Sequence, residues 1–167
     1  MKYSVLAVAA ALAASTAPLA APTAHAAPAD RFLQDAVAGD NGEVAAGRMA
    51  QQRSRNPAVV ELGRTLERDH GEARRQALAT ARQMRVRVDA DAVKPEARQL
   101  QRRLMRLSGP AFDREFARAM VSDHQKDIAK FRLQARVGDP ATRQLARATL
   151  PHLQHHLAMA RDAERRR

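Results

Sequence analysis

Apolar side chains recur every three or four residues along most of the chain after Asp30, which is the spacing of one face of an α-helix. The two clearest examples are Val59, Leu62, Leu66, Ala73 and Ala77, and then Phe112, Phe116, Met120, Ile128, Phe131 and Ala135. Runs of β-branched residues, which are typical of strands, are nearly absent. The pattern therefore predicts amphipathic helices and an all-α protein.

Prolines that stand close behind capping residues, or in a first helical turn, divide this pattern into segments. The breaks are Asn56-Pro57, Lys94-Pro95, Ser108-Gly109-Pro110 and Asp139-Pro140. We therefore predict helices at about 30–54, 57–87, 95–107, 110–137 and 140–165. The connection 88–109 contains the short helix, and at about 1.5 Å per helical residue and about 3.3 Å per extended residue it can cross the length of a bundle. This predicts a ferritin-like four-helix bundle with a short extra helix between its second and third long helices.

The first 26 residues have the features of a signal peptide. Lys2 precedes an unbroken run of small apolar residues, and Ala24-His25-Ala26 matches the pattern after which signal peptidase cuts. The run is too short to favour a permanent membrane span, and the chain has no cysteine for a lipid anchor or a disulfide. We therefore predict cleavage after Ala26 and one helical-bundle domain at 27–167. The product is predicted to be a soluble protein of the periplasm or secreted, and not an integral membrane protein.

The charge of the chain describes the character of its surface and does not identify its function. The formal net charge is +11, and the basic residues are nearly all Arg spread along every predicted helix. This distribution is typical of a solvated helical surface, although it also suits anionic cell-envelope components such as lipids. Aromatic residues make up 3% of the chain, which is too few for the stacking platforms that bind nucleic-acid bases. Nucleic-acid binding is therefore not predicted.

Three polar residues interrupt the apolar faces of the first three long helices. His70 and His124 each occupy a position of the apolar stripe of their helix, three or four residues from its neighbours. Glu43 lies in a stripe of small residues, which favours a carboxylate that faces inward. All three side chains are therefore predicted to point into the bundle.

The last long helix carries three more histidines. His152 and His156 are four residues apart and share a face, whereas His155 is turned by about 100° from His156 and is predicted to be exposed. At about 1.5 Å per residue, the inward candidates of all four helices lie roughly 19–26 Å from the nearer proline turn, close to the middle of helices about 40 Å long. One inward polar residue from each helix at the same level is how bundles build metal sites.

The candidate ligands, one from each long helix, are Glu43, His70, His124 and His156, with His152 as an additional candidate. One carboxylate and three imidazoles suit Zn, Cu, Fe or Ni rather than Mg or Ca. This predicts one transition-metal ion, with Zn, Cu or Fe as the candidates. A second interpretation stays open, because a buried histidine is also commonly a hydrogen-bonded core residue, and Asp69 or Asp123 could supply its partner.

Several stretches together resemble one bacterial family. They are GEVAAGRMA at 42–50, NP followed by a helix that ends in DH at 56–70, LSGPAFDREF at 107–116, MVSDHQKDIAKF at 120–131, and DP followed by LPHLQHHLAMA at 139–160. The chain is similar over nearly all of 27–167 to the family named domain of unknown function 4142. The resemblance implies an exported protein with a ferritin-like bundle, and it implies no established activity. The recurring polar positions of the family match here as Glu43, Asp69, His70, Asp113, His124 and His156. Asp113 thereby joins Asp69 and Asp123 as a side chain expected to support the ligands.

The residues favour binding over catalysis. A ferritin-type di-iron centre needs two Glu-x-x-His motifs and two further glutamates. Glu67 and His70 form one such motif, but Val121 stands where the second would need a glutamate before His124. Nucleophilic catalysis lacks a cysteine, and Ser122 is next to a histidine in sequence rather than across a hydrogen bond from it. We therefore predict a protein that binds, sequesters or senses one metal ion. The alternative is a structural or stress-associated envelope protein whose core histidines are structural and whose Arg-rich surface contacts anionic partners.

Overall fold

The computed structural model describes residues 28–165, and this part of the chain is entirely helical. Its helices are α1 (Ala29–Arg53), α2 (Pro57–Gln83), α3 (Pro95–Met105), α4 (Gly109–Val137) and α5 (Pro140–Arg165), with no strand among the described residues. The predicted all-α class is therefore confirmed. The predicted signal peptide and its cleavage point after Ala26 lie outside the described residues.

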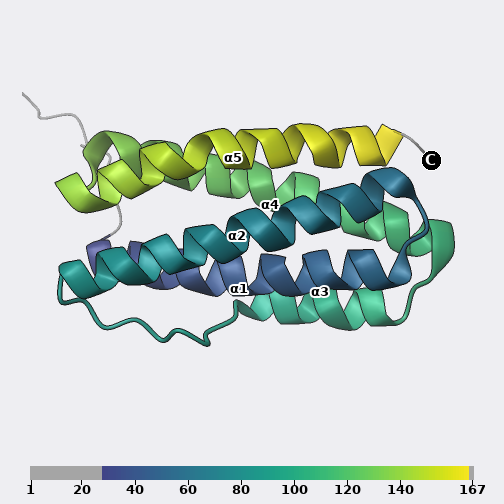
Figure 1. Ribbon diagram of the computed structural model, residues 1–167, viewed down its shortest axis with the longest axis horizontal. Helices are drawn as coiled ribbons and strands as arrows, with labels where there is room; N and C mark the ends of the chain where they lie inside the picture. Colours follow the sequence, from purple (N-terminus) through teal and green to yellow (C-terminus); the bar gives the residue numbers. More distant parts are fainter. Residues whose placement is uncertain (1–27, 166–167) are drawn as a thin grey trace, which may run out of the picture.

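The four long helices pack mainly as two pairs. α1 lies along α2 and α4 lies along α5, while α2 also packs against α5. Figure 1 shows that α2 ends at one end of the molecule and that α4 begins at the other, so the chain between them runs along the length of the molecule, with α3 in its second half. The extended part of this connection is fixed to α1, because Asn41 Nδ2 donates to the carbonyl oxygens of Ala90 at 2.9 Å and Ala92 at 2.8 Å.

α1 and α2 approach each other closely at a pair of glycines. A Cβ atom added at Gly47 would lie 2.5 Å from the backbone oxygen of Gly63, and one added at Gly63 would lie 2.7 Å from the backbone oxygen of Gly47. No side chain other than hydrogen fits between the two backbones at this crossing. The contact lies one helical turn beyond Glu43 on α1 and about two turns before His70 on α2. It therefore sets how closely these two residues face each other.

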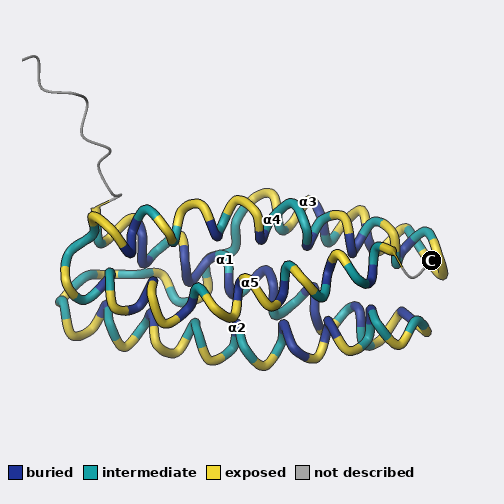
Figure 2. Tube along the Cα trace, turned by 90° about the horizontal axis from the view of Figure 1, so that it is seen from above, coloured by how far each residue is buried: buried dark blue, intermediate teal, exposed yellow. Residues whose placement is uncertain are grey.

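The core consists of two apolar clusters with a polar layer between them. One cluster is centred on Leu62, Phe112 and Phe116, near the α1–α2 turn, and the other on Leu33 and Ala146, near the α4–α5 turn. Buried segments face the interior along all four long helices (Figure 2). Each long helix contributes residues to both clusters. The buried polar residues of the middle turns, described below, are therefore enclosed by apolar side chains on both sides.

α2 ends at Gln83, four residues earlier than predicted. Arg85 has a positive φ of 56°, and the backbone N–H of Val86 donates to the carbonyl oxygen of Ala81 at 2.9 Å. A residue in the left-handed region with this hydrogen bond ends a helix, and the position usually carries glycine. Arginine gives no such signal, so the apolar pattern alone extended the predicted helix to residue 87. No helix among the described residues is long and apolar enough to cross a membrane.

Candidate metal centre

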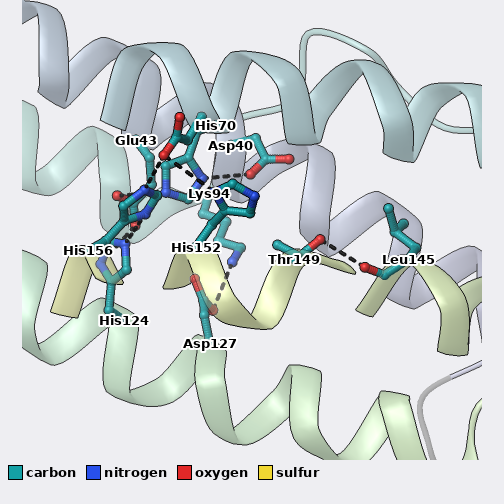
Figure 3. A network of polar contacts seen from close by, with 11 residues as sticks. Asp40, Glu43, His70, Lys94, His124, Asp127, Leu145, Thr149, His152 and His156 are labelled. Atoms are coloured by element: carbon teal, nitrogen blue, oxygen red, sulfur yellow. Dashed lines mark hydrogen bonds and ion pairs between the residues drawn. The ribbon is translucent and has the colours of Figure 1, made fainter. Parts of the chain in front are cut away.

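The structure brings the four predicted ligands together in the polar layer. His70, His124 and His156 are buried, and each offers a ring nitrogen that lies within 4.8 Å of those of the other two. The carboxylate of Glu43 is also buried, with Oε2 3.7 Å from His70 Nε2 and Oε1 3.9 Å from His124 Nδ1. Figure 3 shows these side chains, which come from α1, α2, α4 and α5, converging on one small region.

Each histidine uses one ring nitrogen on a separate hydrogen-bond partner. His70 Nδ1 lies 2.8 Å from Asp40 Oδ1, and His156 Nε2 lies 2.9 Å from Asp69 Oδ2. His124 Nδ1 lies 2.9 Å from the carbonyl oxygen of Met120, one turn earlier in α4. A carbonyl or carboxylate oxygen only accepts, so each of these three nitrogens carries a hydrogen and donates it.

The other ring nitrogens of the three histidines point toward one another. In neutral imidazole only one nitrogen carries hydrogen, so His124 Nε2 and His156 Nδ1 each present a lone pair. These two atoms are 3.2 Å apart, and a hydrogen bond between them would need an additional proton. His70 Nε2 and Glu43 Oε2 are buried and have no hydrogen-bond partner among the described residues. The centre of the cluster is therefore rich in lone pairs.

Burial and charge determine where the protons of the cluster lie. Burial opposes a charge on His70, but the carboxylates of Glu43 and Asp40 outweigh it and raise the pKa of His70 to about 9. Burial and the positive charge on His70 lower the pKa of His156 to about 3, although Asp69 acts in the opposite direction. At neutral pH His70 is thus an imidazolium in the metal-free protein, and His156 stays neutral. The Nε2–H of that imidazolium points into the cluster without an acceptor.

The two carboxylates that bond to the histidines differ in their surroundings. Burial raises the pKa of Asp40, with the hydrogen bond to His70 opposing it. Burial also acts on Asp69, but hydrogen bonds from Arg68 and His156 outweigh it and lower the pKa of Asp69 to about 2. Asp69 is therefore ionised and fixes the hydrogen on His156 Nε2. This arrangement, in which a carboxylate orients an imidazole from behind, is typical of metal-bound histidine.

Asp40 is the functional residue that the sequence analysis missed. It lies on α1 three residues before Glu43 and four after Ala36, so it shares the inward face with both. It is buried, and its contact with His70 is the shortest that this histidine makes with a carboxylate. The helical spacing from Glu43 was a signal that could have identified it.

Two of the side chains expected to support the ligands lie elsewhere. Asp113 accepts a hydrogen bond of 2.6 Å from Ser54 Oγ at the end of α1, and Glu43 lies eleven residues earlier in that helix, or about 16 Å along its axis. Asp113 therefore fixes the α1–α2 turn and does not reach the cluster. Asp123 is 41% exposed and lies 3.7 Å from Lys126 Nζ, and no hydrogen bond joins it to a histidine.

The remaining two histidines of α5 are both exposed. His155 is exposed, as predicted. The side chain of His152 is 62% exposed and lies outside the buried cluster, with Nδ1 3.5 Å from Asp69 Oδ2. His152 shares a helix face with His156, but the cluster lies one turn further along that face. It therefore does not join the three buried imidazoles.

Three hollows of the surface reach residues of the cluster. One, of about 380 Å³, lies along α2 and α5 and is lined by Asp69, His70, His152 and His156 among others. A second, of about 420 Å³, lies along α1, α3 and α4 and reaches Glu43, and none of the three buried imidazoles lines it. The third, of about 180 Å³, lies between α1, α4 and α5 and has Asp40 and His70 in its wall. Of the three, the α2–α5 hollow is the one lined by two of the buried imidazoles.

Most of the chain matches a known protein family. The profile of the family described as "Domain of unknown function (DUF4142)" matches residues 14–163 of the chain. The searches of curated proteins and of solved structures gave no match.

Proposed function

The chain belongs to the family of domain of unknown function 4142, and we propose that it binds one transition-metal ion in its core. The proposed ligands are His70 Nε2, His124 Nε2, His156 Nδ1 and the carboxylate of Glu43. Three imidazoles and one carboxylate are four ligands of the types that bind Zn in proteins. The bound ion would also be a Lewis acid.

The proposal rests mainly on two buried nitrogen atoms, His124 Nε2 and His156 Nδ1, which lie 3.2 Å apart and each present a lone pair to the other. The hydrogens of these two imidazoles are used outward, on Met120 and Asp69, so neither nitrogen can donate to the other. A core that served only to satisfy its histidines would place a donor opposite an acceptor, because unpaired polar groups are costly when buried. A metal ion accepts all of the inward lone pairs at once.

The charges of the layer favour a divalent ion. Asp40 and Glu43 are two buried carboxylates, and His70 is the buried residue nearest to both that can carry a positive charge. When an ion binds, it replaces the proton on His70 Nε2, so one proton is released and two positive charges face two carboxylates. This balance suits a divalent state of Zn, Cu or Fe, which also accept imidazole ligands readily. Mg and Ca prefer oxygen ligands and do not suit this site.

The position of Glu67 supports a single ion rather than a di-iron centre. Its carboxylate accepts hydrogen bonds of 2.7 Å from Arg48 Nε and from Gln51 Nε2, on the outer side of α1 and α2. Glu67 is therefore turned away from His70 although the two form a Glu-x-x-His motif. We propose a ferritin-like bundle that uses its midpoint for one ion and has no ferroxidase pair. The length-wise connection between α2 and α4 supports that topology.

We further propose that the protein is exported to the periplasm or secreted, after cleavage behind Ala26, and that it sequesters or senses the ion there. The support is the sequence of residues 1–26. Mass spectrometry of the product from the cell envelope tests this. A mature chain that begins at Ala27 is expected, and one that retains Met1 would contradict the proposal.

Calorimetric titration of untagged, chelator-treated protein with Zn, Cu and Fe(II) ions tests the metal function, together with thermal melts with and without each ion. We expect binding at one ion per chain and a rise in melting temperature, because a ligand that binds only the folded state stabilises it. Absence of binding, with a large loss of stability when His156 is replaced, would support the structural alternative in which the histidines only hydrogen-bond across the core.

A further inference from the structure

We propose that His152 and Asp69 form an outer station that holds a divalent metal ion before it passes to the buried histidines. This inference rests on the metal function proposed above and adds the route and the residue that first handles the ion. Ligand-type side chains form a continuous line from solvent to core. The side chain of His152 is 62% exposed, that of Asp69 is 11% exposed and that of His156 is 1% exposed.

The side chains along this line lie close together. His152 Nδ1 lies 3.5 Å from Asp69 Oδ2, and the same oxygen accepts the hydrogen of His156 Nε2 at 2.9 Å. An ion at His152 and Asp69 would therefore stand beside the imidazole whose other nitrogen, Nδ1, is the proposed ligand. Arg68 Nε donates to the other oxygen, Oδ1, at 2.7 Å, so Oδ2 is the oxygen that faces both histidines. An imidazole and a carboxylate oxygen can hold an ion that keeps part of its water shell. Such a station binds weakly and releases inward.

The surface shape favours the same side. The hollow of about 380 Å³ along α2 and α5 has His152 and Asp69 in its wall together with His70 and His156, so it joins the outer pair to two of the three buried imidazoles. The hollow of about 420 Å³ along α1, α3 and α4 has Glu43 and Asp123 in its wall but none of the three buried imidazoles. The hollow of about 180 Å³ has His70 in its wall but no exposed histidine. Of these three hollows, the one along α2 and α5 therefore places an exposed histidine beside buried ones.

The uptake rate of Co²⁺ separates this inference from the proposed function. The chain has no Trp, so binding is followed by the visible absorption of the bound ion in a stopped-flow instrument. His152→Ala is compared with His155→Ala, which removes an exposed histidine that makes no contact with Asp69. We expect His152→Ala to slow association about tenfold, the lower end of the effect of a locally concentrated ion on an association rate. Dissociation into excess chelator should slow by the same factor, so the equilibrium affinity stays unchanged. His155→Ala should match the wild type.

A further variant distinguishes a ligand from a merely structural side chain. His152→Asp supplies a carboxylate in place of the imidazole and is expected to restore a large part of the association rate. Equal rates in His152→Ala and His155→Ala would overturn the inference, as would a lower equilibrium affinity at an unchanged association rate. Slow uptake in Asp123→Asn but not in His152→Ala would place the route at the α1–α4 hollow and overturn it as well. A wild type that binds no Co²⁺, Zn²⁺ or Cu²⁺ would contradict the proposed function itself, and the inference with it.

Discussion

Replacing His156 by glutamine removes one imidazole from the cluster and keeps a side chain of similar size. His156 is buried and its Nε2 lies 2.9 Å from Asp69 Oδ2, so an alanine would leave a cavity and remove one hydrogen bond from the Asp69 carboxylate. A glutamine amide can still donate to Asp69. The matched control is His155→Gln, because His155 is the next residue of the same helix and is exposed.

The expected size of the effect follows from ligand loss and linkage. Loss of a contact that merely supports a ligand weakens metal binding by about 10- to 100-fold, so loss of the ligand itself should cost at least about 100-fold, or about 2.7 kcal/mol. Free metal at about 100 times the wild-type Kd stabilises the wild type by about 2.7 kcal/mol. The same concentration about equals the Kd of the variant and stabilises it by about 0.4 kcal/mol. At about 3 °C per kcal/mol, the melting temperature should rise by about 8 °C in the wild type and about 1 °C in His156→Gln.

Thermal melts followed by far-UV circular dichroism, with and without Zn²⁺, measure both proteins and the control under the same conditions. His155→Gln should show the wild-type rise. Equal rises in the wild type and His156→Gln would show that this imidazole is not a ligand. Equal losses in the two variants would show that the wrong face of α5 had been assigned to the metal.

Three further predictions concern protons, orientation and packing. Because His70 has a pKa of about 9 in the fold, above its usual 6.5, the metal must displace its proton. Metal affinity should therefore rise about tenfold per pH unit up to about pH 9, with proton release seen in calorimetry in buffers of different ionisation enthalpy. The interactions that raise the pKa of His70 stabilise the metal-free fold fully below pH 6.5, and this stabilisation is lost as the pH rises through about 9. The free energy of unfolding of the metal-free protein should therefore fall over the pH range in which metal affinity rises. A metal affinity that is flat across this range would contradict the proton assigned to His70. Asp40→Asn should lower metal affinity by about 10- to 100-fold, because it removes the charge that orients His70, and an unchanged Kd would refute that role. Gly47→Ala should lower the free energy of unfolding by about 1–3 kcal/mol, because the added Cβ clashes with the backbone of Gly63. Gly71→Ala, whose nearest new contact is at 4.0 Å, should raise it by about 1 kcal/mol. Denaturant unfolding measures both changes, and a change of the same sign in the two variants would contradict the close packing at Gly47.

The helices and the four proposed ligands could be predicted because helix geometry is regular. Proline turns fix where each long helix begins, and a constant rise per residue then fixes the depth of Glu43, His70, His124 and His156. The apolar stripes of α2 and α4 fix the direction of their histidines. Depth and direction place one polar residue from each of α1, α2 and α4 near the same layer. On α5 they leave both His152 and His156 as candidates, and it is the resemblance to the family that favours His156.

The remainder of the site depends on contacts between helices, which a single sequence does not contain. Asp40 shares the inward face of α1 with Glu43, but an aspartate between Gly39 and Asn41 also suits a surface position, and its hydrogen bond to His70 depends on the packing of α1 against α2. His152 and His156 share a helix face, yet one is exposed and the other buried, because only one of them lies level with the cluster. Likewise, the left-handed conformation of Arg85 could not be predicted, because no glycine or asparagine marks the end of α2.

Metal content is the most direct test of one ion held by three imidazoles and Glu43. The chain is purified without a His tag, incubated with Zn²⁺, Cu²⁺ or Fe²⁺, freed of excess by gel filtration and analysed by inductively coupled plasma mass spectrometry. It is compared with a variant that carries glutamine in place of His70, His124 and His156. The account predicts one ion per chain in the wild type and essentially none in the variant. No ion in the wild type, or the same content in both proteins, would contradict it.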